Sequence, residues 1–219
     1  MDQGTVLLDS SLTGRARLFA RPREVVTLHA GDPDLEGAFA RLQAAQAAGF
    51  WLAGFAAYEL GYRLEPRLAG LLAGKAGAMA GPLLCFGVYE GPVAAAEARA
   101  LLARCDAAAG EAALERVTPG LDAESYAARF RQVRALIAAG DIYQANLTFP
   151  LHLETRGDPL ALYGHLRRAQ PVAHGALVAL EGPLLLSASP ELFFRVDAEG
   201  WLETRPMKGT AARGALERA

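Results

Sequence analysis

Four predicted strands follow one another in the last third of the sequence with only short turns between them. They lie at residues 174–180, 183–189, 191–196 and 201–205. Three further short strands are expected near the start, at residues 5–10, 15–20 and 24–29. Strands that occur in runs, with few helices between them, favour antiparallel sheets over alternating parallel ones. We therefore predict an α+β fold, with largely antiparallel sheets packed in a sandwich-like core and flanking helices.

Helical patterns lie between these runs. Asp32 and Pro33 form a cap followed by proline at the first helical position, so a helix is expected from there to Ala48, with Gly49 as its stop. In residues 122–139 the apolar side chains recur at helical spacing. Further helices are predicted at residues 93–108 and 158–168, the second with proline at its start.

Other segments give simpler predictions. From Tyr143 to Glu154 the apolar residues switch to a period of two, which predicts a strand with one buried face. Residues 69–81 are rich in glycine and alanine and are expected to form a mobile loop. Residues 110–120 have the composition of a linker. Buried strands are also predicted within residues 50–62 and 82–91.

The overall composition excludes several classes of protein. The formal net charge is −2 and charged residues make up 21%, which does not indicate a nucleic-acid or membrane surface. Cys85 and Cys105 provide neither a disulfide framework nor a metal-binding spacing. The longest apolar run, around Phe50–Tyr58, is far shorter than the ~20 residues that span a bilayer. We expect a soluble cytoplasmic protein.

The last predicted hairpin brings a carboxylate and an amine together. If Val196 pairs with Trp201 across the loop at residues 197–200, Glu191 lies opposite Pro206. Lys208 is then two residues further along, on the same face as Pro206. A glutamate and a lysine in this arrangement form either a surface salt bridge, worth about 0–1 kcal/mol, or part of a reactive site.

A reactive Lys208 would have to be neutral. A free lysine has a pKa near ~10.4, so deprotonation at pH 7 costs roughly 4–5 kcal/mol. Burial, or the neighbouring cations Arg205 and Arg213, would supply such a depression of the pKa. The order of residues excludes a phosphate-binding loop, because the lysine precedes its Gly-Thr pair and follows a strand. The four histidines show no ligand spacing, and Ser187 and Ser189 lack a nucleophile elbow.

Three ordered motifs resemble those of the chorismate-utilising enzymes. They are GDIYQANLT (140–148), SASPELFF (187–194) and TRPMKGTAARG (204–214). The segments at 6–11 and 49–62 resemble the start of the same family. The lysine in the last motif makes the chain most similar to aminodeoxychorismate synthases of the component I type. These enzymes act on the p-aminobenzoate and folate route. The resemblance implies an N-terminal subdomain at 1–109, a linker at 110–120 and the first part of a chorismate-binding domain at 121–219.

The resemblance also implies roles for individual residues. Lys208 would attack C2 of chorismate as the C4 hydroxyl leaves, and ammonia would then add at C4 and expel the lysine. Glu191 would be the general acid that protonates the departing hydroxyl. Gly209 and Thr210 would shape the substrate pocket. The expected cofactor is Mg²⁺, and the expected partner is a glutamine amidotransferase subunit that supplies ammonia.

Some positions depart from the family pattern. Leu192 stands where arginine usually follows the glutamate. Members of the family extend further, so the chain is expected to be an N-terminal part, inactive alone, with the Mg²⁺ ligands C-terminal to Ala219.

Some relatives bind L-tryptophan, and Ser10 and Pro171 match that pocket. Two alternatives stay open: anthranilate synthase component I, or a non-catalytic module that binds a ligand or docks a partner.

Overall fold

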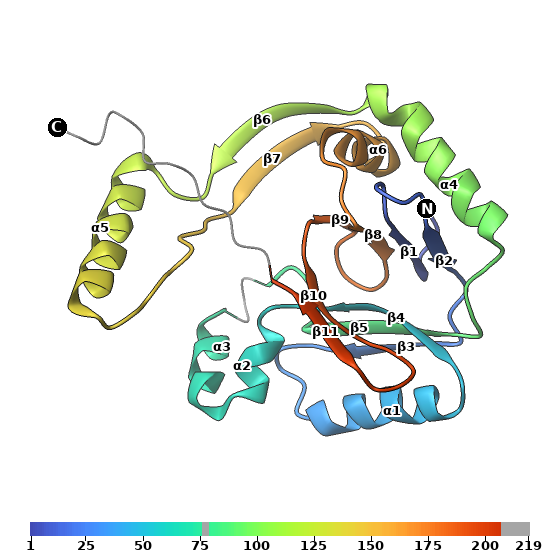
Figure 1. The fold of residues 1–219 in the computed structure, drawn as a ribbon, viewed down its shortest axis with the longest axis horizontal. Coiled ribbons are helices and arrows are strands. Elements are labelled where there is room, and N and C mark those ends of the chain that lie inside the picture. Colours follow the sequence, from blue (N-terminus) through green and yellow to red (C-terminus); the bar gives the residue numbers. More distant parts are fainter. Residues whose placement is uncertain (76–78, 207–219) are drawn as a thin grey trace.

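The computed structural model describes residues 1–75 and 79–206 and has the predicted α+β class (Figure 1). The strands are β1 (Thr5–Asp9), β2 (Ala16–Phe19), β3 (Glu24–Leu28), β4 (Trp51–Ala56), β5 (Leu84–Tyr89), β6 (Ala113–Pro119), β7 (Leu151–Arg156), β8 (His174–Ala179), β9 (Leu185–Ser189), β10 (Leu192–Val196) and β11 (Leu202–Arg205). The helices are α1 (Leu35–Ala47), α2 (Leu60–Leu64), α3 (Ala69–Lys75), α4 (Ala95–Ala108), α5 (Ala123–Ala139) and α6 (Pro159–Ala169). Within the described ranges, none of the helices is long and apolar enough to cross a membrane.

Two antiparallel sheets form the body of the molecule. One has the strand order β2-β1-β8-β9 and the other β3-β5-β4. A buried apolar cluster contains residues of both sheets, namely Val6, Phe19, Ala53, Cys85, Tyr89, Val178 and Leu180. On β1, Val6 belongs to this shared cluster while the next residue, Leu7, belongs to a different one. The two sheets therefore pack face to face, as the sandwich prediction required.

Helices cover the outer faces of both sheets. Helices α1, α2 and α3 contribute buried residues to the cluster on β3-β5-β4, and α4 and α6 do the same on β2-β1-β8-β9. Figure 1 shows α1 against β3, with α4 and α6 on the far side of β1 and β2. The central strands are apolar on both faces because each lies between a sheet and a helix layer. The order of layers is helix, sheet, sheet, helix.

The two helices on the outer face of the first sheet approach each other closely at Gly164. A Cβ at this position of α6 would lie 1.9 Å from the backbone oxygen of Cys105 on α4. We expect Gly164→Ala to lower the free energy of unfolding by about 2–3 kcal/mol, because the backbone of one helix must move. Denaturant unfolding measures the change. Gly61→Ala is the control, since a Cβ at Gly61 on α2 meets nothing within 4 Å; equal stability of the two variants would contradict the close packing.

Tyr89 makes the fold sensitive to alkaline pH. Burial, and then the neighbouring Cys85, raise the pKa of Tyr89 to about 12. An unfolded tyrosine loses its proton near pH ~10. Above that pH the unfolded chain binds fewer protons than the folded one, so the free energy of unfolding falls by ~1.4 kcal/mol per pH unit until the pKa of the folded state is reached. The contribution of Tyr89 is therefore fully present below pH ~10.

Urea unfolding between pH 9 and 12 measures this effect. Burial also raises the pKa of Cys85, Cys105 and Tyr163, so the wild-type slope has several sources. Tyr89→Phe removes one of them together with the hydrogen bond that the hydroxyl donates to the Gly4 carbonyl oxygen, at 3.1 Å. We expect this variant to be less stable at neutral pH and to lose less stability above pH 10. A slope identical to that of the wild type would argue against the raised pKa of Tyr89.

Two predictions for the first half of the chain were wrong in detail. The cap of α1 is Asp34, whose carboxylate accepts a hydrogen bond from the Gly37 N–H at 2.8 Å. Asp32 instead accepts a hydrogen bond from the His29 N–H at 2.7 Å, so it closes the turn before the helix. The segment predicted as a loop at 69–81 contains α3, where Leu72 is buried in the cluster beneath α1.

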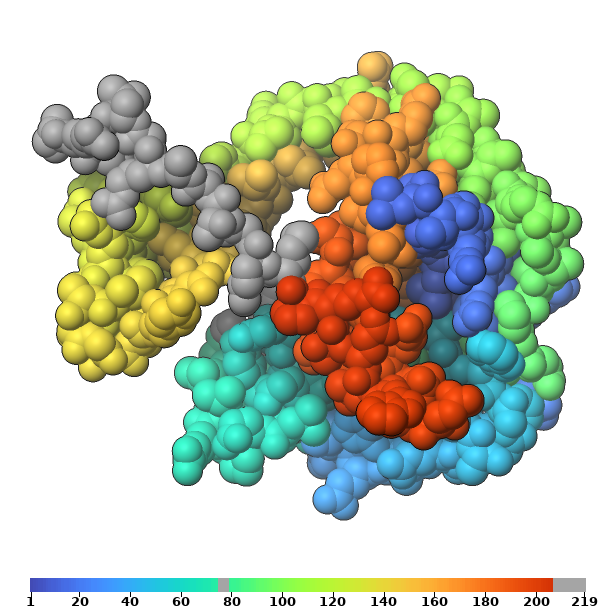
Figure 2. Space-filling view, in the orientation of Figure 1, coloured from blue at the N-terminus to red at the C-terminus, as the bar shows by residue number. Residues whose placement is uncertain are grey.

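The segment on either side of α5 also differs from the prediction. Residues 110–120 contain β6, which pairs with β7. Of the predicted strand from 143 to 154, only residues 151–154 belong to a strand, namely β7, which runs to Arg156. Every residue of β7 is exposed, and α5 buries none of its residues. Figure 2 shows α5 and the segment after it, in yellow, projecting from the compact body. Apolar and polar residues do alternate in this segment. Among the described residues, however, no second layer packs against it to bury its apolar face.

The presence of β6 in the predicted linker does not test the predicted division of the chain into two subdomains. Strand β1, before residue 110, pairs with β8, after residue 121, in register from Thr5–Ala179 to Asp9–Gly175. Helices α4 and α6, which lie on either side of the same boundary, share one buried cluster. The division of the chain at 110–120 stays a prediction.

Candidate functional site

Glu191 lies at the junction between β9 and β10. The hydroxyl of Ser189 donates a hydrogen bond to the Glu191 carbonyl oxygen at 3.1 Å and accepts one from the Glu191 N–H at 3.4 Å. These contacts fix the backbone at the end of β9, and Pro190 lies between the two residues. The side chain of Glu191 is exposed. The carboxyl group is therefore available to a ligand, as a general acid requires.

The hairpin that follows Glu191 has a different register at each end. Near the loop Val196 pairs with Leu202, so the predicted pairing of Val196 with Trp201 is wrong. The cause is the loop, where the Asp197 carboxylate accepts hydrogen bonds from the N–H groups of Trp201 at 2.8 Å and Glu199 at 3.1 Å. The register then shifts, and Leu192 pairs with Arg205.

The shift restores the predicted alignment at the open end of the hairpin. Beyond the pair Leu192–Arg205, the next residues on the two strands are Glu191 and Pro206, as predicted. Lys208, Gly209 and Thr210 lie outside the described residues, so the approach of Lys208 to Glu191 stays a prediction. Leu192 is partly buried beside Glu191 and supplies no charge in place of the usual arginine.

Of the two arginines that flank Lys208 in the sequence, Arg205 is among the described residues, and it is already paired. Arg205 donates to the Glu203 carboxylate, which also accepts a hydrogen bond from Arg195. The hydrogen bond from Arg205, with the charges of both arginines, lowers the pKa of Glu203. Because Arg205 has this partner, it is a weaker source of positive potential than an unpaired arginine would be.

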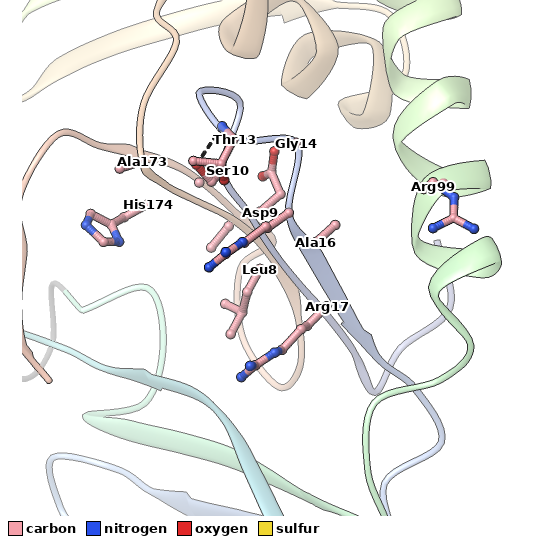
Figure 3. A pocket seen from close by; sticks show the side chains of 13 residues that line it. Leu8, Asp9, Ser10, Thr13, Gly14, Ala16, Arg17, Arg99, Ala173 and His174 are labelled. Atoms are coloured by element: carbon pink, nitrogen blue, oxygen red, sulfur yellow. Dashed lines mark hydrogen bonds between the residues drawn. The ribbon is translucent and has the colours of Figure 1, made fainter. Parts of the chain in front are cut away.

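A cavity lies at the C-terminal end of β1, the first strand of the chain (Figure 3). Its volume is about 780 Å³, and Ser10, Thr13 and Gly14 form one side of it. Ser10, which the sequence analysis matched to a ligand pocket, therefore lines a cavity. Pro171 does not line the cavity, although its neighbour Val172 is tied to Ser11 by hydrogen bonds at 2.8 and 3.1 Å. Binding of L-tryptophan by Ser10 and Pro171 stays a prediction.

A tight turn holds Ser10 in place. The Gly14 N–H donates to the Ser10 carbonyl oxygen at 2.8 Å, and the Ser10 N–H donates to the Arg15 carbonyl oxygen at 2.9 Å. Gly14 has φ +68°, a conformation that glycine adopts without the steric cost other residues incur. The Ser10 hydroxyl accepts a hydrogen bond from the Thr13 N–H at 3.3 Å. The turn therefore presents the end of β1 to the cavity.

A buried charged network lies beneath this turn. The side chain of Asp9 is 1% exposed and accepts hydrogen bonds from the Tyr163 hydroxyl and from Arg167 Nε, the latter at 2.8 Å. Arg167 Nη1 donates to Asp106 Oδ1 at 2.6 Å. Burial, with the hydrogen bond to Asp9, raises the pKa of Tyr163. Burial alone would lower the pKa of Arg167, but the hydrogen bonds to Asp106 and Asp9 outweigh it and raise that pKa.

This network is not among the residues predicted from the sequence. Two signals were present: Asp9 shares the helix-facing side of β1 with Leu7, and Tyr163 and Arg167 are four residues apart on one face of α6. Gly175, opposite Asp9 on β8, leaves the space the network needs, since a Cβ there would lie 2.5 Å from Asp9 Oδ1. Asp9 thereby connects β1, the strand that ends just before Ser10, to α6 and, through Arg167, to α4.

Among the residues that the structure describes, no group of three or more histidine, cysteine, aspartate or glutamate side chains could hold a metal ion. His29, for example, has a single acidic partner, with Nε2 2.8 Å from Glu181 Oε1. The described residues do not fit an Mg²⁺ site, so no chemical step is assigned to the metal. The prediction that its ligands lie C-terminal to Ala219 remains a prediction.

Comparison with known proteins gives one family. Residues 3–219 match the family profile described as chorismate binding enzyme. Aminodeoxychorismate synthase of Streptomyces pristinaespiralis is 42% identical over 91 residues, which is 40% of this chain and 13% of that protein. Aminodeoxychorismate synthase component 1 of Klebsiella aerogenes is 38% identical over 90 residues, 41% of this chain and 20% of that protein. An anthranilate synthase component 1 of Haloarcula marismortui is 36% identical over 91 residues, 42% of this chain and 18% of that protein. Each match thus spans a fifth or less of the relative's length.

Proposed function

Because the chain belongs to the chorismate binding enzyme family, we propose that it is part of an enzyme that converts chorismate and ammonia to 4-amino-4-deoxychorismate. The observation that carries this proposal is Lys208 in the segment TRPMKGT, at the position where the resemblance places the nucleophile. The similarity to proteins named aminodeoxychorismate synthase supports the same reaction. The product would be the precursor of p-aminobenzoate.

The roles of Lys208 and Glu191 follow from the chemistry. The neutral amine of Lys208 adds to C2 of chorismate, both ring double bonds shift by one position, and the C4 hydroxyl leaves as water with a proton from Glu191. The secondary ammonium that forms on Lys208 then releases a proton. Ammonia then adds at C4, both double bonds shift back, and the proton that the new C4 ammonium releases balances the one that the lysine nitrogen takes up as it leaves as the free amine. The exposed carboxyl of Glu191, at the open end of the hairpin that leads toward Lys208, supports its role as the acid.

The proposed reaction needs a source of ammonia. A glutamine amidotransferase subunit is the partner proposed for this step, and one relative is named as component 1 of its enzyme. When bound, Mg²⁺ would neutralise substrate carboxylates, and Gly209 and Thr210 would shape the chorismate pocket.

One specific observation favours a second candidate. The relatives include proteins named anthranilate synthase component 1, at 36% and 37% identity over 91 residues. That reaction uses the same two substrates but releases pyruvate, because the product is aromatic.

Product analysis separates the two reactions. The full-length protein is incubated with chorismate, ammonium and Mg²⁺, and the products are identified by mass spectrometry and by assay for pyruvate. The proposal predicts 4-amino-4-deoxychorismate with no pyruvate. Anthranilate with one equivalent of pyruvate would identify the second candidate, and consumption of chorismate by neither route would overturn both.

A further inference from the structure

Two residues connect the first sheet to the hairpin β10–β11, and one of them is Glu191. Strand β9 ends at Ser189, which is also the last residue of its ladder with β8. Strand β10 begins at Leu192, the first residue of its ladder with β11. Pro190 and Glu191 therefore lie between two ladders and belong to neither. The backbone N–H and C=O of Glu191 are not held by a neighbouring strand.

The Ser189 hydroxyl takes the place of that strand. A hydroxyl group can donate one hydrogen bond and accept others at the same time. The Ser189 hydroxyl uses both capacities on one residue, because it donates to the Glu191 carbonyl oxygen at 3.1 Å and accepts from the Glu191 N–H at 3.4 Å. Pro190 adds a second restriction, since its ring fixes φ at about −65° and favours an extended conformation in the residue before it. Together they hold the Glu191 backbone in one conformation.

The position of the Glu191 carboxyl group depends on this backbone. The side chain is exposed and, in the part of the chain that the structure describes, makes no hydrogen bond or ion pair. A carboxyl group that no neighbouring side chain holds is placed by its own backbone. A general acid must lie within hydrogen-bond reach of the leaving oxygen, and a misplacement of about 1 Å can cost about 10²-fold in rate.

We propose that Ser189 is a positioning residue that acts through Glu191. The inference rests on the proposed function, in which Glu191 gives its proton to the C4 hydroxyl of chorismate. Ser189 is assigned no contact with the substrate and no proton transfer. Its hydroxyl holds the backbone of Glu191 so that the carboxyl group is directed at the leaving oxygen.

Substitutions of Ser189 in the full-length protein test this role. Ser189→Ala removes both hydrogen bonds, so kcat with ammonia is expected to fall about 10-fold, while KM for chorismate changes by less than about 2-fold. Ser189→Thr keeps the hydroxyl and suits an extended backbone before proline, so it should retain most of the activity. Ser187→Ala is the matched control, because Ser187 lies two residues earlier on the same face of β9. Thermal unfolding checks that each variant is folded.

A double-mutant cycle shows whether Ser189 acts through Glu191. Adduct formation with chorismate is followed by intact mass, and Ser189→Ala alone should slow it about 10-fold. In a Glu191→Gln background there is no acid left to position, so Ser189→Ala should slow it further by less than about 2-fold. Equal slowing in both backgrounds would indicate a role independent of Glu191 and would overturn the inference. Full activity of Ser189→Ala, or equal losses for Ser189→Ala and Ser189→Thr, would overturn it as well.

The same measurements separate this inference from the proposed function. If Glu191→Gln is slow and Ser189→Ala is not, Glu191 remains the acid and only the positioning role is excluded. If Glu191→Gln consumes chorismate as fast as the wild type, the role of Glu191 in the proposed function is excluded, and the positioning role is excluded with it.

Discussion

Replacement of Asp9 by alanine is expected to lower the free energy of unfolding by about 3 kcal/mol, at the lower end of the ~3–5 kcal/mol that loss of one partner from a buried ion pair costs. The side chain of Asp9 is 1% exposed and that of Arg167 is 14% exposed, so the remaining guanidinium cannot recover full hydration. Arg167 keeps Asp106, which is why the lower end applies. The Tyr163 hydroxyl loses its acceptor as well. Urea unfolding followed by circular dichroism measures the change.

A surface pair provides the control for this effect. Glu24, half exposed, pairs with Arg41 on the outer face of the second sheet. Glu24→Ala removes one carboxylate from an ion pair, as Asp9→Ala does, but is expected to cost no more than about 1 kcal/mol. A similar loss for the two variants would show that the network around Asp9 is no more important than a surface bridge. The side chain of Asp106 is 44% exposed. The loss in the free energy of unfolding for Asp106→Ala should therefore fall between the losses for Asp9→Ala and Glu24→Ala.

The layered fold was largely predictable because its signals are local. The strand pairs β1–β2 and β8–β9 and the helix α6 arise from short apolar runs, turns and a Pro at a helix start, and all occur where the sequence places them. The order of the strands in the sheets was not predictable. Strand β8 pairs with β1 across more than 160 residues of sequence, and no local pattern encodes that choice.

The errors occurred where the environment decides the structure. The period-two pattern after Tyr143 predicts a strand with a buried face, yet Tyr143 is 93% exposed and only the segment next to β6 becomes a strand. The hairpin register failed at Val196 because the Asp197 side chain, rather than the backbone, organises the loop. The helix start moved from Asp32 to Asp34 because two aspartates compete for the role and only one lies where it can cap.

The candidate site was predictable to different degrees. Ser10 was identified by a motif, and the structure places it in a cavity. Asp9 and Arg167 were missed because their partnership depends on how α6 lies against β1, which the sequence does not show. Glu191 lies at the predicted end of the hairpin, whereas the position of Lys208 is outside the described residues.

Replacement of Lys208 by alanine in the full-length protein is expected to lower kcat with ammonia by roughly 10³-fold or more, because removal of a covalent nucleophile removes the reaction route. When chorismate is supplied without ammonia, a covalent adduct should form on the wild-type protein and none should form on the Lys208→Ala variant. Within residues 1–219 the sequence has two lysines, Lys75 and Lys208, so peptide mapping of this part distinguishes two candidate sites for an adduct. Intact mass followed by peptide mapping detects it, and Lys75→Ala is the matched control that should retain both the adduct and the activity.

The comparison with Glu191→Gln separates a nucleophile from one member of a surface ion pair. If Lys208 is the nucleophile and Glu191 the acid, Glu191→Gln keeps the amine but slows adduct formation, by about 10²–10⁴-fold, because the C4 hydroxyl must leave without a proton. If the two residues only form a surface salt bridge, each substitution changes the free energy of unfolding by about 1 kcal/mol or less and leaves turnover nearly intact. An adduct that maps to Lys75, or full turnover by Lys208→Ala, would exclude the proposed mechanism. Slow adduct formation with Glu191→Gln and none with Lys208→Ala is a pattern that the salt bridge cannot produce.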